Sequence, residues 1–472
     1  MIVVRRALAG ACLALVVVIA VQQAHDAIAT PGRGLDFGPL RDAALALVHG
    51  ASIYSNPRFV YPPTAAVVLL PLSIGSAGGE VDAWIVACTV AVALSGLLSM
   101  APWRRGEWWL MAMLAAALMV KSDALTDSLW IANVSLLLAP VAVGVLLLYE
   151  AGHWRAGSAL LVASLLIKPL LIPLILLPLL RGQWRAILGA ALGGCVLLAA
   201  AILLVPGGAH FFSVLRFLES GGTLTRGAAV YNVSIRGLAQ RLDEASWGSL
   251  ARLAVLAATA ALAFRWARRP AVRGDIAAMG TLLLLALLLA GSLSEDHYLL
   301  VAAPCLLCAL ALWNRFAALL VALPGIVLFA FPVRYIGNVA TSPADLQVRF
   351  VLAELLLAAA PAIFIARAHG RRSVRPPGPF IGAAVALRAT AARASPPQPS
   401  ITLCTLETIG WPGSTPAPLM IGTSVAPNAS NCSWDSQMSK TWIAPPTSSA
   451  TCSVRPSGAP APAASSWLSV SA

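Results

Sequence analysis

Residues 157–180 read GSALLVASLLIKPLLIPLILLPLL, and this stretch decides how the chain crosses a membrane. Two apolar halves flank Lys168-Pro169, and proline disrupts the interior of a helix. The stretch is therefore either one long broken span or a hairpin of two short spans. A charge between two apolar halves is costly unless it faces water or an anion, so Lys168 is a candidate site residue. The alternative is that its ammonium group only snorkels to the lipid headgroups.

The rest of the chain has the same apolar character. Of its 472 residues, 59% are hydrophobic and only 11% are charged, and the mean hydropathy is +0.82. Soluble domains carry roughly 25% charged residues, so the sequence predicts an all-α polytopic membrane protein. The net charge of +13 would suggest a nucleic-acid partner in a soluble protein. Here the arginines stand in short segments between apolar runs, where they orient the chain, and we expect no nucleic-acid partner.

Apolar runs predict about twelve membrane spans, several of them shorter than the ~20 residues that cross a bilayer unaided. The runs are 7–21, 81–100, 108–120, 129–149, 157–167, 170–180, 186–205, 250–264, 276–293, 298–313, 316–331 and 348–366. Residues 62–74 are short and bounded by proline, so we treat them as interfacial or re-entrant. With a hairpin at 157–180, this choice puts the arginine clusters on one side, which the positive-inside rule makes the cytoplasm. The prediction is a plasma-membrane protein with a cytoplasmic N-terminus and its chemistry on the extracytoplasmic side.

The chain changes character near residue 376. Fifteen of its 33 prolines fall in the last 97 residues, together with many Ser, Thr and Ala residues. Such a segment cannot bury enough apolar surface to offset the entropy of ordering it. We therefore predict a membrane domain over residues 1–370 and a disordered cytoplasmic tail, rich in Pro, Ser and Ala, over residues 371–472.

The first outer loop, residues 22–80, is the leading candidate for the reacting part of the molecule. Asp36 lies just after the first span, where a carboxylate is partly desolvated and can act as a general base on an alcohol. The plain alternative is an ordinary solvated loop aspartate. Tyr61 precedes Pro62-Pro63, which either simply opens a helix, as proline does in a first turn, or fixes a short helix beneath a lipid substrate.

Other polar residues beside the apolar runs are candidate substrate contacts. Arg216 and Arg236 could clamp phosphate through paired donors, and Asn232 could bind a sugar hydroxyl; singly, each is as readily a loop-packing residue. His297, in the motif Glu295-Asp296-His297-Tyr298, is expected to contact phosphate or another hydrogen-bonding group, because a metal needs more ligands at suitable spacing. Asn133 opens a span and could simply hold helices together by a hydrogen bond.

Common soluble chemistries leave no signature in the chain. No Walker loop, dinucleotide fingerprint, HExxH or GxSxG pattern is present, and these motifs carry nucleotide, zinc and serine-hydrolase chemistry. Their absence argues against ATP-driven transport and common soluble chemistries, and we expect no cofactor and no metal-ligand set.

Taken in order, these motifs resemble glycosyltransferase family 87, the polyprenyl-phosphate-sugar-dependent membrane enzymes of actinobacterial envelopes within the GT-C superfamily. The resemblance covers roughly residues 1–370, and although each motif is weak alone, the ordered spacing is fairly specific. The matching stretches are Asp36-Phe37, Gly50-Ala51-Ser52-Ile53-Tyr54, Tyr61-Pro62-Pro63, Asn133, Leu166-Ile167-Lys168-Pro169, Gln183-Trp184-Arg185, Asn232-Val233-Ser234-Ile235-Arg236-Gly237 and His297-Tyr298.

The resemblance implies a GT-C-type architecture with a first outer loop and short broken helices. It also implies inverting transfer of an arabinofuranosyl or mannosyl residue from a polyprenyl-phosphate donor to a cell-envelope glycan or glycolipid, with Asp36 as general base. Positive groups would stabilise the departing phosphate, and Lys168, Arg216 and His297 are the candidates.

The sugar stays open. Ile131-Ala132 before Asn133 and the single His297 depart from many mannosyl members of the family. Gln183-Trp184-Arg185, in contrast, looks closer to the branching arabinofuranosyltransferase.

Two other classes of function also fit the composition. A lipid-linked-sugar flippase or secondary transporter uses broken helices and intramembrane charges too, but it predicts paired breaks and the sequence shows one clear Lys-Pro break. A non-catalytic scaffold of an envelope-synthesis complex needs no polar site. Convergence of Asp36, Lys168 and His297 around one outward cavity would separate the enzyme from the scaffold.

Overall fold

The computed structural model describes residues 2–103, 108–219, 232–242, 245–270, 272–291, 294–313, 316–330 and 343–367. The chain divides into two units, residues 1–395 and 396–472. The second unit lies wholly outside the described residues, as does the whole predicted tail, so the tail stays a prediction.

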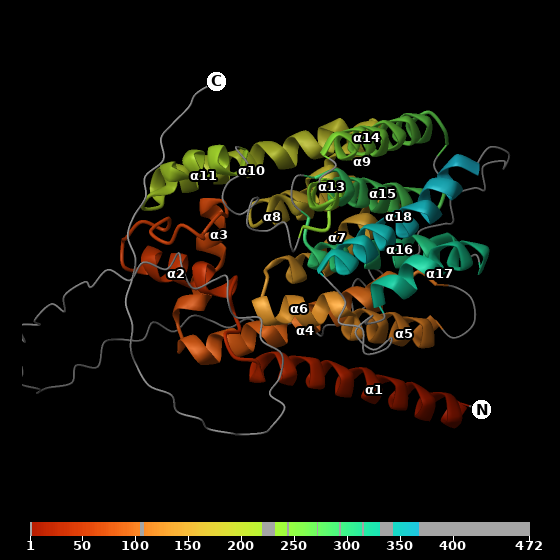
Figure 1. The fold of residues 1–472 in the computed structure, drawn as a ribbon, viewed down its shortest axis with the longest axis horizontal. Coiled ribbons are helices and arrows are strands. Elements are labelled where there is room, and N and C mark those ends of the chain that lie inside the picture. The colour runs from red at the N-terminus through yellow and green to blue at the C-terminus, as the bar shows by residue number, and fades with distance from the viewer. Residues whose placement is uncertain are drawn as a thin grey trace, which may run out of the picture. The chain divides into compact units, whose positions relative to one another are not determined.

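All regular elements in the described ranges are helices, as the all-α prediction requires (Figure 1). They are α1 (Ile2–Ala29), α2 (Phe37–Val48), α3 (Pro63–Val68), η1 (Leu70–Ser73), α4 (Ala77–Met100), α5 (Trp108–Lys121), α6 (Asp123–Ile131), α7 (Ser135–Glu150), α8 (Trp154–Leu165), η2 (Pro169–Ile175), α9 (Leu176–Leu180), α10 (Trp184–Leu204), η3 (Gly208–His210), α11 (Phe211–Glu219), α13 (Ile235–Arg241), α14 (Ala245–Ala267), α15 (Asp275–Ala290), η5 (Asp296–Tyr298), α16 (Leu299–Trp313), α17 (Phe316–Ala330) and α18 (Pro343–Arg367).

Six of these helices are long and apolar enough to cross a membrane, and a bent pair formed by α5 and α6 makes up to seven within the described ranges. The prediction of about twelve spans is therefore not confirmed. Several predicted spans form shorter helices, because proline or a polar turn ends the helix before it reaches the length of a bilayer. Four such shorter apolar segments are Ser135–Glu150, Pro169–Leu180, Asp275–Ala290 and Ala317–Ala330.

The centre of the bundle is formed by α7, α15 and α16, whose side chains are buried over most of their length. The long helix α1 runs along one side of the bundle, and α10 and α14 run along the opposite side (Figure 1). Helices approach closely where glycine permits it: a Cβ on Gly96 of α4 would lie 2.7 Å from the Cα of Ala116 in α5. Small residues at helix contacts are typical of membrane bundles, where close backbone packing replaces the hydrophobic effect.

The chain reverses direction at Lys168-Pro169, as the predicted hairpin requires. Helix α8 begins beside the end of α7, because the rings of Tyr149 and Trp154 stack with centroids 4.9 Å apart. The returning segment, η2 with α9, ends at Arg181, next to the segment that follows α14. Lys168 therefore lies at the tip of the hairpin, at the other end from α7's last turn.

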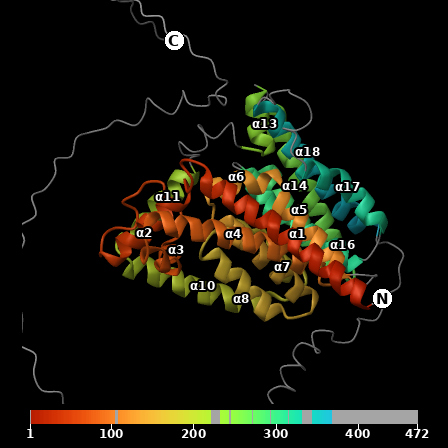
Figure 2. The same ribbon diagram turned by 90° about the horizontal axis from the view of Figure 1, so that it is seen from below.

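The first outer loop folds into α2, α3 and η1, which gather at one end of the bundle near α6 (Figures 1 and 2). The region 62–74, predicted to be interfacial or re-entrant, contains only α3 and η1, and both are far too short to span a bilayer. The hydroxyl of Tyr54 donates to the carbonyl of Tyr61 at 2.8 Å, which holds the loop compact.

Candidate functional site

Asp36 is held against the end of α6 by backbone hydrogen bonds. The N–H of Asp36 donates to the carbonyl of Ile131, and the N–H of Gly34 donates to the carbonyl of Trp130, both at 2.8 Å. The following ring, Phe37, packs against Trp84 with centroids 5.8 Å apart. These contacts fix the backbone of Asp36, so its carboxylate has a defined position at the start of α2.

Asn133 joins Asp36 to the hairpin. Its amide Nδ2 donates to Oδ2 of Asp36 at 2.5 Å, while its Oδ1 accepts from Nζ of Lys168 at 3.2 Å and from the backbone N–H of Ser135 at 2.8 Å. A backbone N–H can only donate, so the oxygen of the amide must face Ser135 and the NH₂ group must face Asp36. One amide therefore stands between a carboxylate and an ammonium group.

The turn that presents Asn133 depends on Ala132. Its φ of 57° makes it the one non-glycine residue with a positive φ among the described residues. The carbonyl of Ala132 accepts from Nε1 of Trp84 at 3.0 Å, which secures the turn against α4. The left-handed conformation ends α6 and lets α7 begin at Ser135, so that Asn133 projects from between two helices.

We expect Ala132→Val to destabilise the protein by about 1–3 kcal/mol, because a β-branched residue with positive φ is strained and the site is fully buried. Ala132→Gly should be nearly neutral, since glycine accepts this conformation without strain. Thermal unfolding in detergent measures both. The control is Ala139→Val, at a buried position within α7; an equal loss for both valine variants would contradict the role of the turn.

Lys168 lies at the centre of the network. Its Nζ donates to Oγ of Ser135 at 2.6 Å as well as to Asn133, and it stands 5.8 Å from the ring centroid of Tyr61 and 4.9 Å from that of Tyr298. The hydroxyl of Thr64 in α3 donates to the carbonyl of Leu166, which ties the tip of the hairpin to the first outer loop. Three other parts of the chain thus surround one ammonium group.

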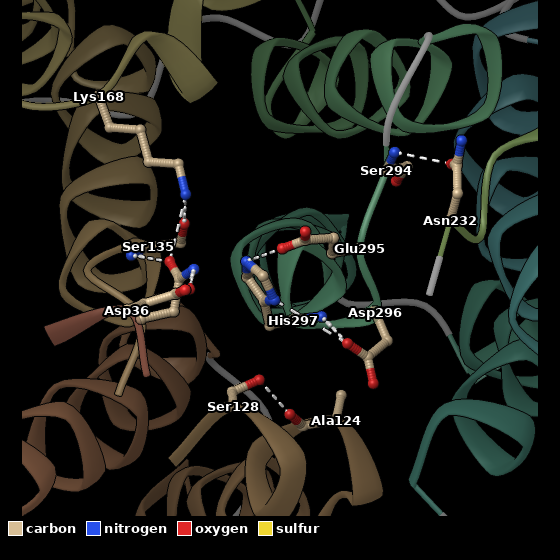
Figure 3. A network of polar contacts seen from close by, with 11 residues as sticks. Asp36, Ala124, Ser128, Ser135, Lys168, Asn232, Ser294, Glu295, Asp296 and His297 are labelled. Carbon is tan, nitrogen blue, oxygen red and sulfur yellow. Dashed lines mark hydrogen bonds and ion pairs between the residues drawn. The ribbon is translucent and has the colours of Figure 1, made fainter. Parts of the chain in front are cut away.

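The motif Glu295-Asp296-His297-Tyr298, which follows α15, lies opposite Asp36 and Lys168 (Figure 3). Nε2 of His297 lies 3.2 Å from Oε2 of Glu295, and the backbone N–H of His297 donates to Oδ1 of Asp296 at 2.8 Å. The imidazole meets the ring of Tyr298 edge-on at 4.4 Å. His297 is buried, with Glu295 and Tyr298 against its ring.

Burial and nearby charges shift the pKa values of two groups beside Lys168. Burial raises the pKa of Glu295, the ammonium group of Lys168 lowers it, and the carboxylate of Asp36 raises it again. Burial, followed by the charges of Asp36 and Glu295, raises the pKa of Tyr61, so that its hydroxyl stays protonated. Both shifts mark a site with little water and more than one carboxylate near a single ammonium group.

Asn232 binds the chain segment that precedes this motif. Its Oδ1 accepts from the backbone N–H groups of Ser294 and Ser234 at 3.0 and 3.1 Å, and the N–H of Val233 donates to the carbonyl of Ser294 at 2.7 Å. Gly237 fits tightly here, because a Cβ at this position would lie 2.2 Å from the carbonyl oxygen of Asn232. Asn232 therefore positions the segment that carries Glu295 and His297.

The structure brings five of the eight predicted site residues into contact or close to it: Asp36, Tyr61, Asn133, Lys168 and His297 all belong to this network or touch its members. Asn232 supports it from behind. Arg216, exposed on α11, and Arg236, half-buried on α13, have no hydrogen bond, ion pair or ring contact with the network in the described ranges. Their part in substrate binding stays a prediction.

Three members of the network were not among the predicted site residues: Ser135, Glu295 and Tyr298. Glu295 and Tyr298 flank His297 in the sequence, but nothing in the motif itself indicates that both face the same lysine. Ser135 follows Asn133 by two residues, and both side chains accept from Lys168. The sequence does not show the turn at Ala132 from which this shared contact follows.

The network combines a fixed carboxylate, a fixed ammonium group and a buried imidazole. A carboxylate can accept the proton of an attacking hydroxyl, and an ammonium group can stabilise the charge that develops on a departing phosphate. No group of three or more His, Cys, Asp or Glu side chains suited to a metal ion occurs in the described ranges. Hydrogen bonds join Asp36, Asn133, Lys168 and Ser135, and the ring of Tyr298 lies near both Lys168 and His297.

Comparison with known proteins identifies a family for this chain. The sequence model of glycosyltransferase family 87 matches residues 59–293, a range that contains Tyr61, Asn133, Lys168 and Asn232. Asp36 precedes the matched range and His297 follows it, so their place in the site rests on the contacts described above. No curated protein and no solved structure matches the chain. Through the matched half of its sequence, which holds the centre of the site, the chain belongs to glycosyltransferase family 87 and is a membrane glycosyltransferase.

Proposed function

We propose that the protein transfers an arabinofuranosyl or mannosyl residue from a polyprenyl-phosphate donor to a cell-envelope glycan or glycolipid. The observation that carries the proposal is the bridge Asp36–Asn133–Lys168, in which one amide holds a carboxylate and an ammonium group apart. The described residues contain no ion pair that joins Asp36 directly to Lys168. The carboxylate of Asp36 and the ammonium group of Lys168 can therefore each still bind a substrate.

The reaction has one bond-forming and one bond-breaking event at the anomeric carbon. The acceptor hydroxyl attacks this carbon from one face, and its proton passes to the carboxylate of Asp36. The bond from the anomeric carbon to the phosphate oxygen breaks on the opposite face, so the configuration inverts. The leaving group is the lipid phosphate, and no nucleotide, cofactor or metal takes part in the proposed scheme.

Lys168 stabilises the leaving phosphate. Its Nζ already donates to Asn133 and Ser135, and an ammonium group has three donors. One donor thus remains for a phosphate oxygen, with the rings of Tyr61 and Tyr298 on either side. A lysine held by side chains before the substrate arrives costs little reorganisation during the reaction.

We also propose that the network faces the extracytoplasmic side of the plasma membrane. The arginine-rich segments stand at the other ends of α7 and of the hairpin, and such segments are retained in the cytoplasm. A polyprenyl-phosphate sugar reaches the site from the bilayer, and the acceptor approaches from the aqueous side.

The direct test is an incubation of the purified full-length protein with radiolabelled polyprenyl-phosphate arabinose or polyprenyl-phosphate mannose and an oligosaccharide acceptor. We expect label to enter the acceptor with one of the two donors and not with a nucleotide sugar. The outcome that rejects the proposal is movement of the donor across proteoliposome membranes without formation of a glycosidic bond.

Glu295 gives the reaction a pH dependence with a defined sign. Because its pKa is raised, Glu295 takes up a proton at a higher pH than an ordinary glutamate, which titrates near ~4.3. Protonation removes the negative charge of Glu295 from beside His297 and Lys168. We therefore expect the transfer rate to fall as the pH drops below the raised pKa of Glu295. Glu295→Gln, which is never charged, should be slower at neutral pH and lack this acidic limb; an unchanged limb in the variant assigns it to another group.

A further inference from the structure

A second polar cluster lies at the other end of the elements that form the catalytic network. Helix α7 runs from Ser135 to Glu150, and the returning half of the hairpin runs from Lys168 to Arg181. The second cluster therefore stands about one helix length from the network, at the opposite end of α7. Its members are Glu150, Arg181, Trp266, Arg269 and Asp275.

Both carboxylates of the cluster have partners: Glu150 binds backbone N–H groups, and Asp275 forms a long ion pair with Arg269. Glu150 accepts from the backbone N–H groups at the start of α15, from Gly274 at 3.1 Å, Ile276 at 2.9 Å and Ala277 at 3.0 Å. These bonds satisfy the free donors of the helix end. Oδ2 of Asp275 is 4.0 Å from Nη2 of Arg269, which is too long for a hydrogen bond.

The two arginines of the cluster have buried donors without acceptors. Nη1 of Arg181 donates to the carbonyl of Arg269 at 2.8 Å, and its guanidinium lies over the ring of Trp266 at 3.8 Å. Nε and Nη2 of Arg181 and all three nitrogens of Arg269 are buried without a hydrogen-bond partner in the described part of the chain. Guanidinium donors without an acceptor are costly, and phosphate oxygens are the acceptors that match their geometry.

The surroundings indicate that the phosphate belongs to a lipid. Trp184 at the start of α10 is 50% exposed with the guanidinium of Arg185 5.2 Å from its ring, and Phe264 near the end of α14 is 57% exposed with Arg268 at 3.8 Å. Exposed aromatic rings paired with arginine are typical of the level of the lipid headgroups.

We propose that Arg181 and Arg269 bind the phosphate of an anionic phospholipid headgroup. Basic pockets between transmembrane helices on the cytoplasmic side are suited to such headgroups. The side chain of Arg269 is 12% exposed, and it turns toward the headgroup region to receive the phosphate, while Arg181 stays stacked on Trp266. The site is separate from the glycosyl-transfer site and does not depend on its assignment.

The test titrates the purified full-length protein with phosphatidylglycerol, phosphatidylcholine or inorganic phosphate and counts bound molecules by native mass spectrometry. We expect phosphatidylglycerol to bind about tenfold more tightly than phosphatidylcholine, and Arg269→Gln to lose about this factor, as for one charge-assisted contact. Arg155→Gln is the matched control, because Arg155 is exposed in the first turn of α8 at the same surface and should leave binding unchanged.

A variant that keeps the charge guards against a folding artefact. Arg269→Lys retains the positive charge but loses the planar set of donors, so it should bind phosphatidylglycerol more weakly than the wild type. Equal binding by the wild type and Arg269→Lys overturns the claim that guanidinium donors hold the phosphate. Equal displacement of the lipid by inorganic phosphate at the same concentration overturns the assignment to a lipid.

Discussion

Replacing Asp36 by asparagine is expected to lower the rate of glycosyl transfer by about a thousandfold, the size typical of a lost general base. The substitution changes little else. Asparagine can present its own oxygen to Nδ2 of Asn133, so the bond that joins the first outer loop to the start of α7 can persist. The fall should appear in kcat with little change in KM for either substrate, because the missing step is proton removal in the transition state.

Asp42 supplies the matched control for this experiment. It lies in α2 six residues after Asp36, is exposed, and accepts from Nδ2 of Asn56 at 2.8 Å. Asp42→Asn removes a carboxylate of the same loop without touching the network, so transfer should stay within about twofold of the wild type. Retained transfer by Asp36→Asn would falsify the assignment of Asp36 as the base.

The sequence located the centre of the site because polar residues are rare in this chain. Lys168 stands between apolar halves, and a charge in that position is costly unless it has a function. Asp36 and His297 were singled out by similar reasoning and by the ordered motifs that resemble family 87. These residues come from distant parts of the chain, and the fold places them near one another.

The contacts of the network were beyond sequence reasoning for a physical reason. They depend on a left-handed turn at Ala132, a conformation in which glycine is expected, and on a chain reversal at Lys168-Pro169. Without these turns, Ser135 is only another residue of an apolar run. Arg216 and Arg236 have no contact with the network in the described ranges, and their part in substrate binding stays a prediction.

The number of spans shows a similar limit. Counting apolar runs treats α7, α15 and the hairpin as ordinary spans, although their helices are shorter than a bilayer requires. Their ends carry the candidate site on one side and the arginine cluster on the other, so polar residues begin where the helices stop.

Replacing Lys168 by glutamine is expected to lower kcat/KM for the lipid-linked donor by a factor of about one hundred to one thousand, as for a lost electrostatic stabiliser. Glutamine is uncharged and close to lysine in size, so it leaves no large cavity beside Tyr61 and Tyr298. We therefore expect only a small change in the midpoint of thermal unfolding. Lys168→Arg should retain part of the activity, since it keeps the charge but changes its position.

The comparison of activity with stability separates a phosphate-binding role from a structural one. If Lys168 served only to hold the hairpin to α7, activity and thermal stability would fall together in Lys168→Gln. If it stabilises the departing phosphate, activity falls while the protein remains folded and still binds the acceptor. Lys121→Gln is the control, because Lys121 is exposed at the end of α5, and its loss should leave both quantities unchanged. If a folded Lys168→Gln variant transferred sugar at the wild-type rate, Lys168 would not stabilise the departing phosphate. His297 would then be the candidate for that role.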